Sequence, residues 1–121
     1  MSDAVLATEI FDRLRQAAAA TPGVLEELCR DYVIEARATM SQIREAVSAK
    51  DPERLRDRAH YLKGSSMMIG ARVLSQYCAS LEAMGRDRKL EAASSELDGA
   101  ACALSAVESE LLREVGPSAL P

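Results

Sequence analysis

The sequence predicts an all-α fold, an antiparallel up-down-up-down four-helix bundle with an additional N-terminal helix. Composition is the first reason: 48% of the 121 residues are apolar but only 3% are aromatic, which favours helices packed by aliphatic side chains. Proline occurs at only four positions, so long uninterrupted helices fit between them. Apolar residues also recur at the spacing of a helix face, without a β-hairpin signal. Five amphipathic helices with short connections build such a bundle.

The first half of the chain is predicted to form two helices. The first runs from about Asp3 to Ala19 and ends at the turn Thr21-Pro22-Gly23. Thr21 is predicted to cap the second helix, about Pro22–Ala49, with proline at its first position. The residues expected to be buried are Leu6, Ile10, Leu14 and Ala17 in the first helix and Leu25, Leu28, Tyr32, Ala36, Met40, Ile43 and Val47 in the second.

The next two helices are predicted to form a hairpin that turns near Gly70. Asp51 is expected to cap the third helix, which begins at Pro52 and ends near Gly70. The fourth helix covers about Ala71–Arg86. Their apolar seams are Leu55, Ala59, Leu62, Ser66 and Ile69 in the third helix, and Leu74, Cys78, Leu81 and Gly85 in the fourth, widened by Tyr77 and Met84.

The last helix, about Asp87 to Val115, has a seven-residue leucine repeat. The repeat consists of Leu90, Leu97, Leu104 and Leu111, with Ala93, Ala100 and Val107 between them. Such a heptad is compatible with a homodimeric coiled coil. It spans only about four heptads and is rich in alanine, so packing inside the bundle is favoured and a monomer is expected. Residues 1–121 are predicted to form one domain, with a tail at about 116–121 that frays.

Charge is unevenly distributed along the chain. The formal net charge is −4, but residues 50–72 carry six Lys/Arg against three Asp/Glu, and the segments on either side are acidic. The basic segment suits an acidic partner or a phosphoryl group. The overall acidity, without a pattern of aromatic and basic residues, argues against nucleic acid.

Other features indicate the class of protein. Cys29, Cys78 and Cys102 are widely spaced and odd in number, so we expect small core residues in a reducing compartment rather than disulfides. One histidine and three dispersed cysteines give no metal-ligand spacing. No signal peptide and no apolar run of membrane-spanning length is evident, so a cytoplasmic location is expected. Six scattered glycines form no P-loop, and no nucleophile–base pair at catalytic spacing indicates a hydrolase.

The single histidine, His60, is the main candidate for chemistry. It follows the seam residue Ala59 and is therefore rotated about 100° away from the core. Arg56, Lys63, Gly64 and Met67 share its side of the helix. A neutral imidazole is a nucleophile near neutral pH, and a cation one turn away suits an incoming phosphoryl group. Taken alone, His60 could also be an ordinary surface histidine that has no functional role.

The hairpin places a second set of residues opposite this histidine. Residues about ten positions on either side of Gly70 should face each other, which brings Leu81, Glu82 and Arg86 across the groove from His60. Glu82 is expected to accept a hydrogen bond from one ring nitrogen and leave the other free. Arg86 and Lys63 are expected to pair with phosphoryl oxygens. An ordinary helix salt bridge between Glu82 and Arg86 is the alternative.

Together these residues resemble the histidine-containing phosphotransfer (HPt) domain of two-component phosphorelays. The motifs are His60-Tyr61-Leu62-Lys63-Gly64-Ser65-Ser66, Gly70-Ala71, Leu74-Ser75-Gln76-Tyr77-Cys78 and Leu81-Glu82, and the resemblance covers about residues 8–113. It implies that His60 carries the phosphoryl group, that Lys63 is the supporting cation and that Gly64 lets a receiver domain approach. Members often have a glutamine where Glu82 stands. A carboxylate there is expected to orient the ring and repel phosphate.

The resemblance implies a phosphocarrier rather than an enzyme. His60 would accept a phosphoryl group from a receiver aspartyl-phosphate and pass it to another receiver aspartate, with a hybrid sensor histidine kinase as a further partner. No cofactor is expected, because receiver domains bring their own acidic metal-binding pocket. Docking is expected around Arg56 and Met67, whereas Met68 is expected to pack at the helix end. The alternative is a helical-bundle adaptor that binds a signalling partner without being phosphorylated.

Overall fold

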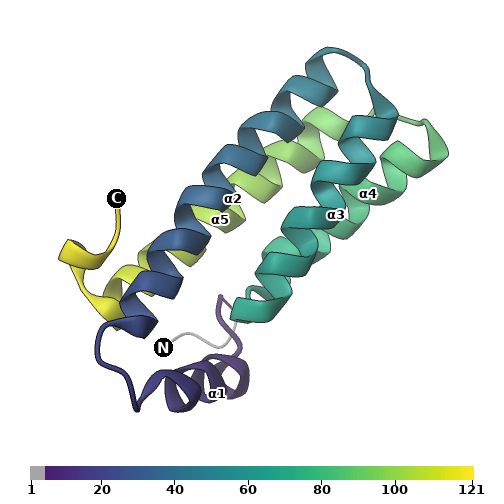
Figure 1. The fold of residues 1–121 in the computed structure, drawn as a ribbon. Coiled ribbons are helices and arrows are strands. Elements are labelled where there is room, and N and C mark those ends of the chain that lie inside the picture. The colour runs from purple at the N-terminus through teal and green to yellow at the C-terminus, as the bar shows by residue number, and fades with distance from the viewer. Residues whose placement is uncertain (1–4) are drawn as a thin grey trace.

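The computed structural model describes residues 5–121, which form five α-helices and a short C-terminal 3₁₀ helix (Figure 1). The predicted start of the first helix at Asp3 lies outside the described residues. The elements are α1 (Thr8–Ala18), α2 (Val24–Ser48), α3 (Pro52–Ile69), α4 (Arg72–Asp87), α5 (Ala93–Val115) and the 3₁₀ helix η1 (Pro117–Ala119).

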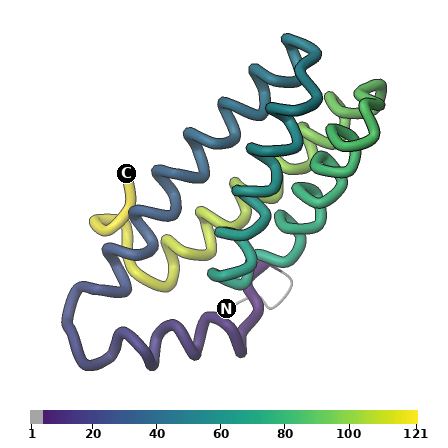
Figure 2. Tube along the Cα trace, turned by 45° about the vertical axis from the view of Figure 1, so that its right-hand side comes forward, coloured from purple at the N-terminus to yellow at the C-terminus, as the bar shows by residue number. Residues whose placement is uncertain are grey.

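Helices α2 to α5 form the predicted antiparallel bundle. Each helix packs against two others, α2 against α3 and α5, and α4 against α3 and α5, so α3 and α5 lie diagonally opposite each other. The shorter helix α1 lies across one end of the bundle, beside the start of α2 and the turn between α3 and α4 (Figure 2). The predicted fold class is therefore confirmed.

Two helix boundaries differ from the prediction. Thr21 does not cap α2, because Gly23 precedes the helix in a left-handed conformation (φ 87°) and the first helical residue is Val24. Only glycine adopts this conformation without steric cost, so it sets the boundary. The last helix begins at Ala93 rather than Asp87, because α4 continues to Asp87 and ends at Arg88, which is also left-handed (φ 56°).

The core lies between the four long helices and contains three leucines of the predicted repeat, Leu97, Leu104 and Leu111. The fourth, Leu90, precedes α5 and is half-buried. One polar pair crosses the core: the hydroxyl groups of Tyr32 and Ser66 lie 2.8 Å apart. Leu28 is an exception to the predicted core, since it is 44% exposed near α1.

The three cysteines differ in exposure. Cys29 and Cys78 are fully buried, and burial raises the pKa of Cys29 to about 11 and that of Cys78 to about 12. Cys102 lies on the exposed side of α5, which corrects the expectation that all three are core residues. A cysteine among apolar residues of a helix can lie on the buried or on the exposed face, and only the packing of the helices decides which.

The C-terminal tail contacts the bundle. Ala119 in η1 is buried, and its carbonyl oxygen accepts a hydrogen bond of 2.9 Å from Nε of Arg30 in α2. Because Gly116 turns the chain at φ 90°, the tail folds back toward α2.

Candidate functional site

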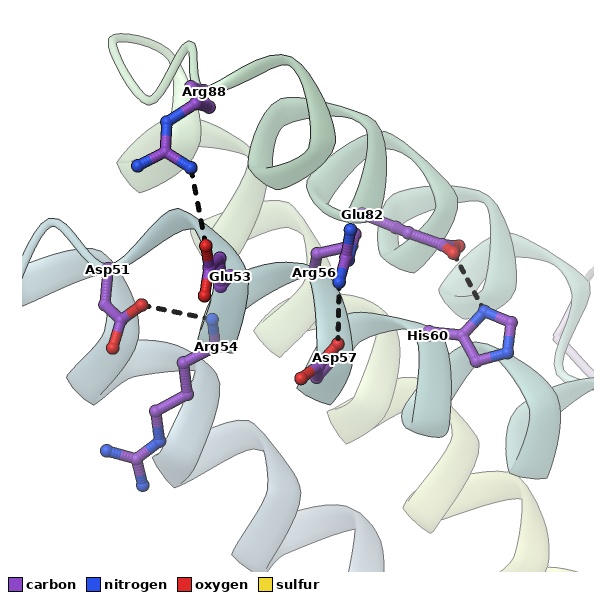
Figure 3. Close-up of polar contacts among 8 residues, drawn as sticks. All are labelled: Asp51, Glu53, Arg54, Arg56, Asp57, His60, Glu82 and Arg88. Carbon is purple, nitrogen blue, oxygen red and sulfur yellow. Dashed lines mark hydrogen bonds and ion pairs between the residues drawn. The ribbon is translucent and has the colours of Figure 1, made fainter.

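The ends of α3 are fixed by sequence signals, and this sets the direction of His60. The Asp51 side chain accepts a hydrogen bond of 3.1 Å from the backbone N–H of Arg54, and Pro52 occupies the first turn (Figure 3). Gly70 ends the helix in a left-handed conformation (φ 86°). The predicted seam of α3 is buried, so His60, one position after buried Ala59, points outward with 69% of its side chain exposed.

Close packing of α3 on α4 sets the register that brings Glu82 to the histidine. Gly85 of α4 lies against the backbone of Pro52 and Arg56 in α3. One turn earlier in α4, Glu82 lies level with His60, and its Oε2 is 2.8 Å from Nδ1 of the ring. Its Oε1 accepts a hydrogen bond of 2.6 Å from Nζ of Lys63. The side chain of Glu82 in α4 therefore links two residues of α3, His60 and Lys63.

The electrostatics of this cluster determine which ring nitrogen carries the proton. Burial raises the pKa of the Glu82 carboxyl, but the hydrogen bonds from Lys63 and His60 outweigh it, and the net effect lowers the pKa. At neutral pH Glu82 is therefore an anion and can only accept hydrogen bonds. The Nδ1 atom of His60 must be the donor. Its Nε2 lies on the side of the ring that faces away from Glu82 (Figure 3).

The remaining predicted site residues lie on the same surface but differ in their contacts. The Nε of Arg86 lies 3.4 Å from Oδ1 of Asp87. Among the described residues no ion pair joins Arg86 to Glu82, so the helix salt bridge between them is not formed. Arg56 pairs with Asp57 at 3.6 Å. Gly64 is exposed, and no atom would lie within 4 Å of an added Cβ.

The surface beside His60 contains exposed apolar side chains. Met67 is 58% exposed, as the docking prediction requires, and Met68 is 78% exposed, which corrects its assignment to helix-end packing. An apolar hollow between α1, α2 and α3 adjoins Met68 and was not predicted from the sequence. Its lining includes Leu14, Leu28 and Ile69. The only sign of this hollow in the sequence is that the three helices contain more apolar residues than the core can bury.

A second, more polar hollow adjoins the imidazole itself. It is lined by Arg56, Asp57, Arg58, His60, Tyr61 and Glu82.

Among residues 5–121 there is no group of three or more potential metal ligands. Within the same range no helix is long and apolar enough to cross a bilayer.

An outward imidazole on a helical bundle, held at one nitrogen by a carboxylate, is an arrangement suited to accepting a phosphoryl group. The family model for the Hpt domain matches residues 27–114, and the chain therefore belongs to the Hpt domain family. It has a phosphotransfer role in phosphorelays, and its family comprises phosphocarriers rather than kinases or ATPases.

Solved structures show the same fold. The chain is similar to the histidine-containing phosphotransfer protein B of Pseudomonas aeruginosa PAO1, whose crystal structure superposes with a TM-score of 0.86. The two sequences are 24% identical, and the match covers 94% of this chain and 96% of that one. No match is found among curated proteins.

Proposed function

We propose that His60 is the phosphoryl carrier, which takes the group from an aspartyl-phosphate of one receiver domain and delivers it to the aspartate of another. The observation that carries this proposal is the state of the ring: 69% of the side chain is exposed, and Nδ1 is held by Glu82. The free Nε2 can attack phosphorus in line while the aspartate carboxylate leaves. The chain acts as a cytoplasmic, monomeric phosphocarrier without an ATP site or a cofactor.

The receiver is proposed to dock on the outer face of α3 and on the apolar hollow beside α1. Exposed Met67 and Met68 supply adaptable apolar area that more than one receiver can cover. Arg56 and Lys63 lie at the rim, where their charges suit the acidic pocket of a receiver. Gly64, being exposed and without a side chain, lets the partner backbone approach the imidazole.

The test is phosphoryl transfer to His60 and to the variant His60→Gln. The chain is incubated with receiver domains of the same genome that have been labelled with acetyl phosphate. We expect a label on the wild type that survives alkali but not acid, and none on His60→Gln. Because the imidazole is mostly exposed, the variant should unfold at the same temperature as the wild type. An unlabelled wild type with every receiver would refute the proposal and favour the adaptor.

Docking is tested separately with a matched pair of substitutions. Met68→Asp places a charge on the proposed docking face, and Leu112→Asp places one on α5, diagonally opposite α3, at a leucine that is 41% exposed. We expect transfer to slow about tenfold or more for Met68→Asp, which corresponds to about 1.4 kcal/mol, and to be unchanged for Leu112→Asp. Equal rates in both variants would exclude this face.

A further inference from the structure

The apolar hollow between α1, α2 and α3 has an acidic edge. Its volume is about 340 Å³, and apolar side chains line much of it, among them Leu14, Leu28 and Ile69. Two carboxylates of α2, those of Asp31 and Glu35, line the same hollow, and both residues are exposed. The described residues that line it include no lysine or arginine. A partner that covers the hollow therefore meets apolar surface and negative charge together.

The polar side chains of the hollow differ in whether they are already bonded. Three of the four have a partner within the chain: Glu35 accepts from the Tyr61 hydroxyl, Tyr32 shares a hydrogen bond with Ser66, and Ser65 donates to the carbonyl oxygen of Leu62. The fourth is Asp31, and no hydrogen bond or ion pair joins its carboxylate to any other residue within 5–121. Asp31 is therefore the group of the hollow that is open to a partner.

The ring of Tyr61 separates two different charge environments on the docking face. Its hydroxyl is held by Glu35 of α2, and the guanidinium of Arg58 in α3 lies over the ring, 5.2 Å from the centroid. On the His60 side of this ring, the polar hollow is lined by arginines and carboxylates in equal number. On the α1 side, the charged groups of the lining are carboxylates only. A preference for a cation is thus confined to the hollow beside α1.

The free energy of covering Asp31 depends on what the partner brings. A carboxylate that loses its water without gaining a partner carries a desolvation penalty. A lysine or arginine removes this penalty, because its aliphatic stem packs on the apolar lining while its charged end binds the carboxylate. An apolar or acidic side chain in the same place leaves Asp31 unpaired. The hollow therefore disfavours some partners as well as favouring others.

We infer that Asp31 is a specificity-determining residue of the docking face, and that the hollow takes a lysine or arginine side chain of the receiver domain. The inference rests on the proposed function, since it assumes that receivers dock beside His60. Glu35, which is already bonded to Tyr61, adds negative charge next to Asp31. Receivers that share the same acidic phosphorylation pocket are then distinguished by whether a basic side chain lies at the right distance from it.

The test compares wild type, Asp31→Asn and Asp31→Lys in phosphoryl transfer from receiver domains of the same genome that have been labelled with acetyl phosphate. For the receivers that the wild type uses best, kcat/KM should fall about tenfold in Asp31→Asn, the lower end of what the loss of a hydrogen bond to a charged group costs. It should fall further in Asp31→Lys. For the receivers that the wild type uses poorly, Asp31→Asn should cause no loss, so the preference among receivers shrinks.

Asp98→Asn and Asp98→Lys are the matched controls. Asp98 is an exposed aspartate of α5, the helix diagonally opposite α3. These variants change the net charge by the same amounts and should keep the receiver preference of the wild type. Phosphoramidate, whose ammonia leaves as the N–P bond to His60 forms, is a donor without a docking face. It reports the state of His60 in each variant, and the losses caused by Asp31 substitutions should be confined to receivers.

A charge exchange identifies the group that binds Asp31. In the receiver that the wild type uses best, each exposed lysine and arginine is replaced in turn by glutamate. One such receiver variant should be poor with the wild type and regain transfer with Asp31→Lys, because the ion pair is restored with its charges exchanged. If Asp31→Lys rescues none of them, the occupant is not a basic side chain and the inference is overturned.

The outcomes separate this inference from the proposed function. If receivers exchange phosphoryl groups with His60 but Asp31→Asn keeps the wild-type preference, the role of Asp31 is refuted and the carrier role stands. If no receiver transfers to His60, the carrier role fails, while calorimetric binding of receivers to wild type and Asp31→Lys still decides whether Asp31 selects them. A wild-type dimer that Met68→Asp dissociates in sedimentation would assign the hollow to a second copy and overturn the inference.

Discussion

Alanine substitutions at Gly64 and Gly85 are predicted to change stability in opposite directions, although both glycines lie in the two helices that build the site. At Gly64 a Cβ would meet no atom within 4 Å, so only the backbone entropy changes. At Gly85 a Cβ would lie 2.6 Å from the carbonyl oxygen of Pro52 and 2.7 Å from the backbone nitrogen of Arg56. Those atoms belong to the first turns of α3 and cannot rotate away as a side chain does.

The magnitudes follow from these two surroundings. Replacing glycine by alanine inside a helix stabilises by about 1 kcal/mol, and we expect Gly64→Ala to show most of this gain. At Gly85 the same gain is opposed by overpacking, which typically costs about 1–3 kcal/mol. Because backbone must move, we take the upper part of that range and expect a net loss of about 1–2 kcal/mol. The two variants should therefore differ by about 2–3 kcal/mol.

Urea unfolding followed by circular dichroism measures this difference directly. In thermal unfolding it corresponds to roughly 8–12 °C for a chain of this length. A displacement of α4 at Gly85 also moves Glu82, so phosphorylation of His60 by phosphoramidate should slow in Gly85→Ala and remain normal in Gly64→Ala. If Gly85→Ala is as stable as Gly64→Ala, the close helix contact does not set the register, and the reasoning about the site geometry is refuted.

Three further predictions concern single groups. A thiol reagent should modify one cysteine quickly in the native protein, Cys102, and all three in denaturant; fast modification of more than one native thiol, or of the variant Cys102→Ser, would contradict the burial of the others. Tyr32→Phe leaves the buried Ser66 hydroxyl without its partner and should lower the free energy of unfolding by about 1–3 kcal/mol, an effect that should shrink when Ser66→Ala is added. The pKa of Glu82 is lower in the folded chain, so its stabilising effect should be full above the unfolded pKa and be lost as the pH falls through the folded pKa; an advantage over Glu82→Gln in urea unfolding that is the same at neutral and strongly acidic pH would contradict this.

The helices that carry the site were predictable because local signals determine them. Asp51 and Pro52 begin α3, and Gly70 ends it, through conformations that these residues adopt in many contexts. The outward direction of His60 follows from one helical step beyond the seam. The contact with Glu82 was predictable in turn, because two helices joined by a short turn can pair in few registers.

Features that depend on tertiary packing were not predictable. The start of α2 was predicted at Pro22 with Thr21 as its cap, but the chain enters the helix through Gly23 in a left-handed conformation, which a threonine-proline start signal does not reveal. The exposure of Met68 depends on where α1 crosses the bundle. Arg86 has a long side chain that several carboxylates can attract, and the structure pairs it with its neighbour Asp87. Helical periodicity alone contains none of this information.

On the proposed carrier role of His60, the charge arrangement of the site suits passing a phosphoryl group on better than holding it. In the described structure Lys63 is paired with Glu82, and Arg86 with Asp87, so neither cation is already directed at Nε2. A cation clamp that bound the phosphohistidine more tightly than the transition state would slow its delivery to the next aspartate. Because Glu82 is already bound to Lys63 and to Nδ1 of His60, the N–P bond would be the main attachment of the phosphoryl group to this chain. Stabilisation of the transferring group then has to come largely from the receiver, so transfer between His60 and an aspartate should be fast only in the docked complex.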